Sequence, residues 1–281
     1  MAISILSRLR QQFHATLLDE LLTLSANGIA SNADSGSKWS KLFAKGIVDR
    51  IGNATVTEKL PGQTSGAKFE LICAAFIREA MQHLAHLRPG HFDVEVGGFI
   101  AKYKQYAHLD DLEAIAQKNK EIATALGADY LIKPDIVVSR RPEPDQSINQ
   151  LSLLVDDVTA VRSDLRARFN PMPLLHASIS CKWTLRSDRA QNARSEGLNL
   201  VRNRKGSLPH VVVVTGEPLP SRIASLALGT GDIDCVYHFA LDELRDCLMA
   251  PGQEGYLDTL DMMIEGGRLK DIGDLPLDLV V

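Results

Sequence analysis

The sequence predicts an α/β protein with one mixed β-sheet flanked by helices, and we expect residues 1–281 to form a single domain. Three features lead to this prediction. Apolar residues recur at helical spacing within 68–87, residues 173–183 alternate as a strand, and residues 208–215, "LPHVVVVT", have the pattern of a buried strand. Helical and strand patterns alternate along the chain without repeats, and its length suffices for a substantial core.

The first third is predicted to be helices joined by polar loops. Residues 4–24 form an amphipathic pattern, because arginine, glutamine and histidine interrupt the apolar residues. The stretch 27–40 is rich in asparagine, serine and glycine, and 60–66, "LPGQTSG", also has loop composition. The helix over 68–87 follows, and we expect the Arg-Pro-Gly of 88–90 to end it.

Shorter elements are predicted in the middle of the chain. Residues 93–99, "DVEVGGF", indicate a strand and a hairpin turn, and 110–127 indicates one helix that stops at Gly127. A short apolar strand spans 135–139 and a proline-containing loop spans 140–150. The stretch 151–170 is ambiguous and could hold a strand and a short helix.

The last third contains the strongest strand patterns. Residues 173–183 place Ser180 and Lys182 on one face, with Cys181 and Trp183 on the other. Ser187 has the chemistry of an N-cap, which predicts a helix over about 188–204. The buried strand at 208–215 and a short strand followed by a helix over 235–250 complete the prediction.

Charge and cysteine content exclude several classes of protein. The net charge of −4 argues against a protein that coats nucleic acid, but 182–205 carries a focused excess of basic residues that can bind phosphate locally. No cysteines have the spacing of a zinc site, so we expect reduced, mostly buried thiols at Cys73, Cys181, Cys235 and Cys247. The sequence shows neither a membrane span nor a secretory signal, so we expect a cytoplasmic location without membrane association.

An aspartate and a lysine at the ends of neighbouring strands suggest metal-dependent phosphodiester cleavage. Asp135 would bind a hard cation such as Mg²⁺, and Lys182 would stabilise developing charge or help to deprotonate the attacking water. The residues Pro134-Asp135 and Ser180-Cys181-Lys182 follow the PD-(D/E)-x-K nuclease pattern. They depart from it at Ser180, because a hydroxyl is a poor Mg²⁺ ligand.

The missing carboxylate is assigned to Glu196, which lies on the predicted helix and could reach back toward the strand ends. The alternative is a solvated Glu196 paired with Arg194 or Arg202. Glu70, expected at the beginning of another helix, could serve as a further acid. We expect Mg²⁺ as the cofactor, with two ions per active site.

The segment Arg186-Ser187-Asp188-Arg189 spans the predicted helix start. In the major groove, arginine pairs with guanine O6 and N7, and aspartate accepts a hydrogen bond from cytosine N4, so Arg186, Asp188 and Arg189 could read two G·C pairs. The alternative is a capping segment whose charges point into solvent.

The stretch 173–206 as a whole resembles the NgoMIV-type, CCGG-recognising restriction endonucleases of the PD-(D/E)xK nuclease family. Similar segments cover most of the chain and are weakest in 142–170; they include "SNAD" (31–34), "LPGQTSG" (60–66), "PDIVV" (134–138), "LPHVVVVT" (208–215), "PSRI" (220–223) and "ALGTGDIDCVYHFAL" (227–241). The resemblance implies the restriction-endonuclease-like fold, and its version of the motif also has Ser-x-Lys with a glutamate on a helix.

The resemblance also implies roles for individual residues. Asp135, Lys182 and Glu196 would form the catalytic core, with Ser180 and Glu70 in supporting roles through water or the lysine. The readers of the inner CCGG are Arg186, Asp188 and Arg189, and the residues linked to the outer base pair or its minor-groove face are Gln63, Asp34 and Arg222.

These features and the resemblance together predict a type II restriction endonuclease that cuts double-stranded DNA at a palindromic CCGG-core site and leaves 5′-phosphates. The resemblance implies the outer base pair and the cut position, G/CCGGC, and with them a four-base 5′ overhang. A palindrome requires a two-fold protein, so we expect a homodimer. The resemblance implies a homotetramer, with some of its assembly surface in 142–170, and a cognate DNA methyltransferase as genetic partner. The alternative is a sequence-specific DNA-binding protein that is inactive or adapted to repair; decay usually removes a metal ligand or the lysine, yet Asp135, Lys182 and Glu196 are all present.

Overall fold

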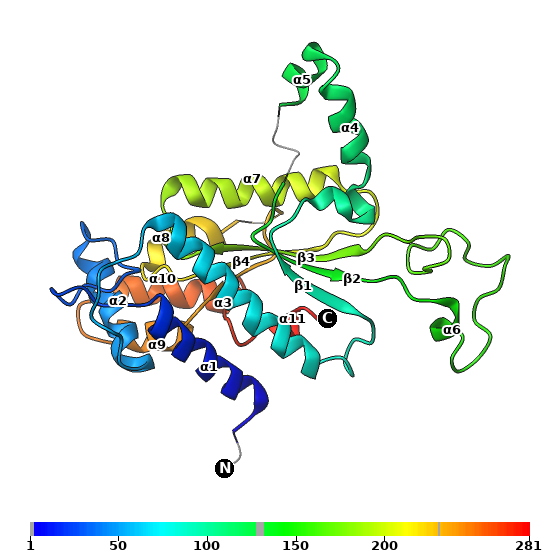
Figure 1. The fold of residues 1–281 in the computed structure, drawn as a ribbon. Helices are drawn as coiled ribbons and strands as arrows, with labels where there is room; N and C mark the ends of the chain where they lie inside the picture. The colour runs from blue at the N-terminus through cyan, green and yellow to red at the C-terminus, as the bar shows by residue number, and fades with distance from the viewer. Residues whose placement is uncertain (1–2, 128–131, 230) are drawn as a thin grey trace.

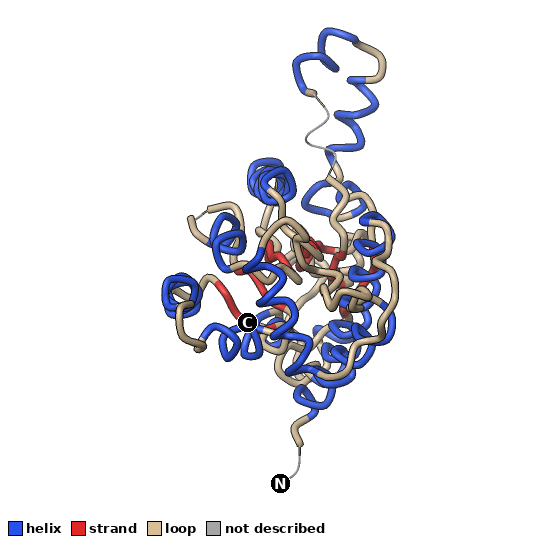
Figure 2. The backbone as a smooth tube through the Cα atoms, turned by 90° about the vertical axis from the view of Figure 1, so that its left-hand side faces the viewer, coloured by secondary structure: helices blue, strands red, loops and turns tan. Residues whose placement is uncertain are grey.

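The computed structural model describes residues 3–127, 132–229 and 231–281, and its centre is a mixed β-sheet with helices on both sides (Figures 1 and 2). Within these residues the sheet has six strands in the order β1-β2-β3-β4-β5-β6. β2 is antiparallel to both β1 and β3, whereas β3 to β6 run parallel. The strands are β1 (Phe92–Val96), β2 (Ile136–Arg140), β3 (Leu174–Lys182), β4 (His210–Thr215), β5 (Cys235–His238) and β6 (Leu269–Asp271). The α/β fold with a mixed sheet is confirmed.

The strands are apolar on both faces because both faces are covered. On one side of the sheet, Val138 and Ile179 belong to the large core that helices α1 (Ile5–Glu20) and α3 (Gly62–His83) complete. On the other side, Val137 packs near Leu200 of helix α7 (Ser187–Asn203). The alternation expected in 173–183 is also present: Cys181 and Trp183 join the large core on the face opposite Ser180 and Lys182.

Helices surround the sheet. The helices of the described residues are α1 (Ile5–Glu20), α2 (Lys38–Ile51), α3 (Gly62–His83), α4 (His108–Ala116), α5 (Lys120–Leu126), α6 (Asp145–Ile148), α7 (Ser187–Asn203), α8 (Pro220–Ala227), α9 (Leu241–Leu248), α10 (Glu254–Glu265) and α11 (Leu275–Asp278), with the 3₁₀ turns η1 (Ile100–Lys102) and η2 (Lys104–Tyr106). Serine side chains cap α1 and α2, because Ser4 Oγ accepts from the Ser7 N–H and Ser37 Oγ from the Ser40 N–H. No helix in the described residues is long and apolar enough to cross a membrane.

The start of α3 corrects the sequence prediction at 60–66. The helix begins at Gly62, because Pro61 takes the N-cap position and the Ser65 N–H donates to the Pro61 carbonyl over 2.9 Å. Gln63 therefore lies in the first helical turn. Glu70 lies in the third turn of this helix and not at its beginning.

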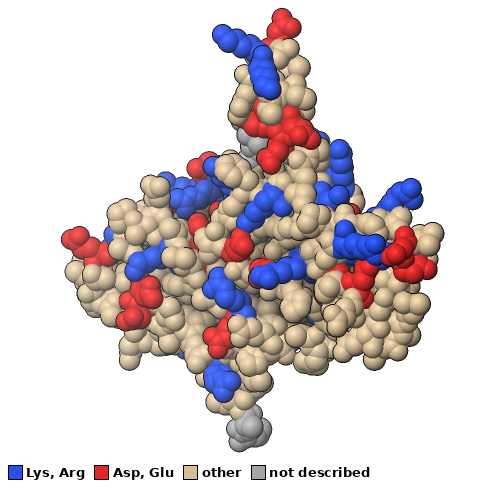
Figure 3. Space-filling model, turned by 45° about the vertical axis from the view of Figure 1, so that its right-hand side comes forward, with Lys and Arg blue, Asp and Glu red and all other residues tan. Residues whose placement is uncertain are grey.

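The single helix expected over 110–127 is two helices, α4 and α5. Asn119 interrupts it, because its side-chain oxygen accepts from the N–H groups of Glu121 and Ile122 and so starts a second helix. Gly127 ends α5 with φ +65°, as expected. The pair projects from the body (Figures 1 and 2), and on the face shown in Figure 3 acidic side chains gather at its base.

Other local predictions differ from the structure. The hairpin expected after β1 is absent, because β1 pairs with the distant β2 and is followed by η1 and η2. The ambiguous stretch 151–170 forms neither a helix nor a strand. It belongs to an arm, residues 142–170, that projects to the right in Figure 1 and is tied together by buried Arg166, whose guanidinium forms a bidentate ion pair with Asp145. Helix α7 begins at Ser187 with Arg186 as its N-cap residue, one position earlier than expected.

Candidate active site

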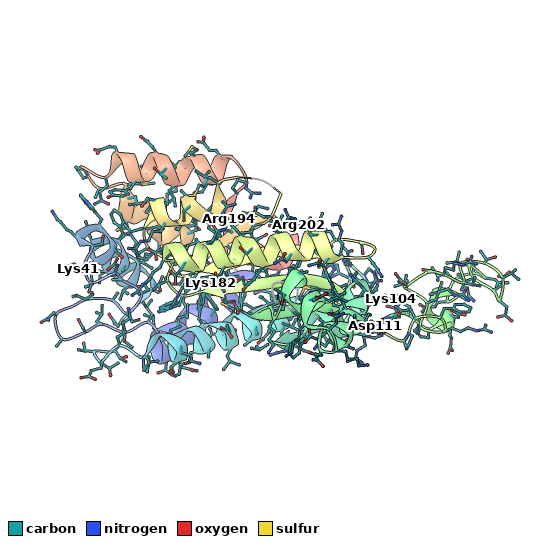
Figure 4. All side chains as sticks on the ribbon, turned by 90° about the horizontal axis from the view of Figure 1, so that it is seen from above. Lys41, Lys104, Asp111, Lys182, Arg194 and Arg202 are labelled. Carbon is teal, nitrogen blue, oxygen red and sulfur yellow. The ribbon has the colours of Figure 1, made fainter. Side chains whose placement is uncertain are left out.

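The sheet brings Asp135 and Lys182 together at the junction of β2 and β3. Because these strands are antiparallel with Ile136 opposite Ile179, the residue before β2 lies beside the end of β3. Asp135 Oδ2 accepts hydrogen bonds from the Cys181 N–H at 2.7 Å and from Lys182 Nζ at 2.9 Å. Figure 4 shows Lys182 beneath α7.

Glu196 reaches the same point from α7. Its Oε2 lies 3.4 Å from Ser180 Oγ, and that hydroxyl also lies 3.4 Å from Asp135 Oδ2. The alternative in which Glu196 pairs with Arg194 is wrong, because Arg194 Nη1 donates to Asp232 at 2.7 Å and its other nitrogens donate to the carbonyls of 225–228. These contacts anchor α7 on the 225–232 segment.

Close packing against the 225–232 segment fixes the height of α7 above the sheet. A Cβ atom added to Gly197 would meet the carbonyl group of Asp232 and lie 3.2 Å from Val211 Cγ1. Only glycine allows this approach, which keeps the neighbouring Glu196 near Ser180.

The charges of the cluster are partly balanced. Burial alone would lower the pKa of Lys182, but the nearby Asp135 and Glu196 carboxylates outweigh it and raise that pKa, so the lysine is a firm cation. Burial raises the pKa of Glu196, although Lys182 opposes the shift. Burial and the Asp135 carboxylate also raise the pKa of Glu70. The carboxylates therefore exceed the positive charge of one lysine.

This cluster fits a divalent cation. Asp135 Oδ1 and Glu196 Oε1 accept no hydrogen bond from the described residues, and both carboxylates converge on Ser180. Carboxylate oxygens are the ligands that hard cations prefer, and a cation would relieve the charge excess. Within the described residues, no three acidic, histidine or cysteine side chains lie close enough together to hold one ion.

The predicted base-reading residues gather around the N-terminal end of α7. Arg186 and Asp188 are exposed there, and Arg189 Nη1 lies 3.2 Å from Thr184 Oγ1. A Cβ added to Gly62 would lie 3.7 Å from Arg189 Nη2, so the first turn of α3, with exposed Gln63, lies beside the start of α7. The structure thus brings segments 60–66 and 186–189 together.

The remaining two predicted residues, Asp34 and Arg222, form an ion pair beside this surface. The Arg222 guanidinium lowers the pKa of Asp34, so Asp34 stays ionised. Both line a pocket of about 470 Å³ that Arg186 also lines. Segments from four distant parts of the chain therefore meet at one surface next to the acidic cluster.

Sequence reasoning missed two charged residues at this surface. Burial lowers the pKa of Lys59, and the nearby Arg186 and Arg189 cations lower it further. Glu217 is fully buried behind Arg222, with 3.7 Å between its Oε2 and Arg222 Nη1. A glutamate three residues after the apolar run 211–214 was the available signal for Glu217, since charged residues are rarely buried without a partner.

The prediction of reduced, buried cysteines is confirmed. All four cysteines are free and buried, and Trp183 is a core residue. His176 packs against His210 and donates a hydrogen bond from Nε2 to the Leu279 carbonyl, away from the acidic cluster.

The chain is similar to known proteins along most of its length. The family model of the NgoMIV restriction enzyme matches residues 13–281. The type II restriction enzyme NgoMIV of Neisseria gonorrhoeae is 56% identical over 278 residues, which cover 97% of each chain. Two solved structures are more distant. The type IIF restriction endonuclease Bse634I with cognate DNA has 12% identity and a TM-score of 0.37, covering 96% of this chain and 92% of that one. The PspGI restriction endonuclease–substrate DNA complex has 15% identity and a TM-score of 0.27, covering 99% and 92%.

Proposed function

Because the chain belongs to the NgoMIV restriction enzyme family and is a type II restriction endonuclease, we propose that it hydrolyses both strands of double-stranded DNA at G/CCGGC, leaving 5′-phosphates and a four-base 5′ overhang. The observation that carries the proposal is the convergence of Asp135, Lys182 and Glu196 beside a surface lined with Arg186, Asp188 and Arg189.

We infer that the divalent metal ion is Mg²⁺, with two ions per active site. Asp135 and Glu196 would hold metal, and Glu70 would act through water or through Lys182. When bound, the metal polarises the scissile phosphate and lowers the pKa of the attacking water. The Lys182 ammonium, held 2.9 Å from Asp135, stabilises negative charge that develops on the phosphate. The Ser180 hydroxyl orients the two carboxylates that it lies between.

The proposed reading of the site follows from side-chain chemistry. Arg186 and Arg189 match the O6 and N7 acceptors of guanine, and Asp188 matches the N4 donors of cytosine, which gives CCGG across two half-sites. Gln63 and the Asp34–Arg222 pair extend the site by the outer G·C pair. Methylation of a core cytosine at N4 or C5 blocks cleavage in this proposal, which is how a cognate DNA methyltransferase would protect the host DNA from an enzyme that acts in the cytoplasm.

The proposal includes the assembly of the protein. In this proposal residues 1–281 act as one endonuclease domain, since the large core contains residues from Leu9 to Leu279. One Asp135–Lys182 pair per chain and two scissile bonds per site require at least a homodimer. The exposed apolar side chains Leu151, Leu153 and Val158 on the 142–170 arm support further association into a homotetramer.

A digestion experiment tests the proposal. Purified protein is incubated with plasmid DNA and Mg²⁺, with EDTA and Lys182→Ala as controls, and the fragment ends are sequenced. We expect discrete fragments whose 5′-CCGG overhangs are followed by a C that pairs with a 3′-terminal G. A shifted band without cleavage would favour the inactive DNA-binding alternative, and ends without a CCGG core would refute the base-reading assignment.

A further inference from the structure

We propose that Glu217 is a positioning residue that holds the two groups of base-reading residues in register with one another and with the catalytic strand, so that it determines sequence discrimination without touching DNA. The inference rests on the proposed reading roles of Arg186, Asp188, Arg189, Asp34 and Arg222.

The Glu217 carboxylate bridges the starts of two helices. Its Oε2 accepts a hydrogen bond from the Leu185 N–H at 2.8 Å, directly before Arg186 at the start of α7. Its Oε1 accepts from the Leu219 N–H at 3.2 Å, at the N-cap of α8, which carries Arg222. One side chain therefore sets the distance between the segment that reads the inner pairs and the segment that reads the outer pair.

Arg222 extends this bridge to the N-terminal loop. Its Nη1 lies 3.7 Å from Glu217 Oε2, and its Nη2 donates to Asp34. Asn32 ties the same loop to the residue before Glu217, because its Nδ2 donates to the Gly216 carbonyl at 2.8 Å. Two bonds thus fix the 31–34 loop relative to the 216–217 segment.

The segment around Glu217 is also fixed to the catalytic strand. The Lys182 carbonyl accepts hydrogen bonds from the Gly216 N–H at 3.1 Å and from Thr215 Oγ1 at 2.8 Å. A Cβ on Gly216 would lie 2.8 Å from Trp183 Cζ3, so this close approach requires glycine. A displacement of the Glu217 bridge would consequently shift the position of the base-reading residues relative to Lys182.

Glu217 is charged at neutral and slightly alkaline pH. Burial raises its pKa to about 6, against the hydrogen bonds from Leu185 and Leu219 and the attraction of Arg222. The charged and titratable groups that face it are Arg222, Asp34 and Lys59, with His238 at its backbone carbonyl. His238 accepts the Ala240 N–H at Nδ1 and has a pKa of about 4, so it is neutral throughout the range considered.

Replacing Glu217 by glutamine keeps the shape and removes the bridge. A glutamine amide has one acceptor oxygen and one NH₂ donor. One of the two backbone N–H groups, at Leu185 or Leu219, would then face a donor, and Arg222 would lose its buried counter-charge. Protonation of Glu217 below pH 6 has the same effect, because a carboxylic acid also presents one donor oxygen.

The test measures kcat/KM on three duplexes with identical flanks: GCCGGC, the outer-pair variant ACCGGT and the inner variant GCGCGC. We expect Glu217→Gln to lower the preference for GCCGGC over ACCGGT by about tenfold or more, the ratio that 1.4 kcal/mol corresponds to. Glu243→Gln is the matched control, since Glu243 also pairs with an arginine, Arg10, but is only partly buried and lies on α9 away from this surface. It should keep the wild-type ratio.

A pH series on the wild type gives a second readout that needs no variant. The GCCGGC/ACCGGT ratio should fall between about pH 8 and about pH 5.5 in the wild type and stay flat in Glu217→Gln. Titration of Glu196 or Glu70 slows cleavage of both duplexes and cancels in the ratio. A purely structural role would lower the melting temperature without changing the ratio.

The outcomes separate the inference from the function on which it rests. A wild type without preference for GCCGGC refutes the proposed site and not the bridge. A wild type that prefers GCCGGC, with a Glu217→Gln variant of equal preference at about pH 8, overturns the inference. If the variant does not fold, a wild-type ratio that is constant across the pH series overturns it.

Discussion

Gly197→Ala tests whether the packing of α7 sets the active-site geometry. The added Cβ would lie 3.2 Å from Val211 Cγ1 and from the carbonyl carbon of Asp232, and closer still to the Asp232 carbonyl oxygen. Neither the backbone nor a β-branched valine can give way as a flexible side chain would. The helix or the 225–232 segment must therefore move by roughly 1 Å to restore ordinary contact distances.

Such a movement has two consequences of predictable size. Overpacking of this kind costs about 1–3 kcal/mol of the free energy of unfolding. Glu196, the neighbour of Gly197, now lies 3.4 Å from Ser180 Oγ, at the limit of a hydrogen bond. A shift of roughly 1 Å takes it out of range, and misplacement on that scale costs about a hundredfold in rate.

The assay measures two quantities, kcat on a GCCGGC duplex and the melting temperature, for the wild type, Gly197→Ala and Gly255→Ala. Gly255 is a matched control, because it is also helical and nothing lies within 4 Å of an added Cβ. We expect Gly255→Ala to keep the wild-type rate and stability. A Gly197→Ala enzyme that cuts at the wild-type rate would show that the position of Glu196 does not limit cleavage.

Three further predictions concern single side chains. Lys182→Met removes the ammonium beside Asp135 but keeps much of its bulk; cleavage should fall by at least about a hundredfold, while gel shifts without metal should show near wild-type DNA binding. Arg189→Ala should cost about 1–3 kcal/mol of discrimination per half-site, seen as lower kcat/KM on GCCGGC with nonspecific affinity changed much less. Arg166→Met removes the hydrogen bonds to Asp145 and to the Asp156 carbonyl. Backbone hydrogen exchange within 156–170 should therefore rise, and light scattering should show weaker association of the chains. Unchanged exchange would contradict the role of Arg166 in the arm.

Local sequence patterns indicated strands β1 to β5 and the helices α1, α3, α7 and α9, but they did not indicate β6 or helices such as α2, α8 and α10. The alternation in 173–183 and the apolar run in 211–214 could only be satisfied by strands with covered faces, so β3 and β4 were predictable. The chemistry of the site was also readable, because Asp135 and Lys182 stand at strand ends where side chains leave the core. The resemblance of the surrounding residues to one family then indicated the type of enzyme.

Only the tertiary structure decided which of these residues meet and what holds them there. The split of 110–127 and the early start of α3 depended on the caps Asn119 and Pro61, which local apolar spacing does not reveal. Glu217 gave no motif, because its partners at Leu185 and Leu219 are backbone groups on two other segments. The approach of α7 that places Glu196 depends on the absence of one Cβ at Gly197, and nothing in the sequence shows what that glycine faces. Contacts between distant segments arise from three-dimensional packing, and so the sequence predicted the parts of the site while the fold set the distances between them.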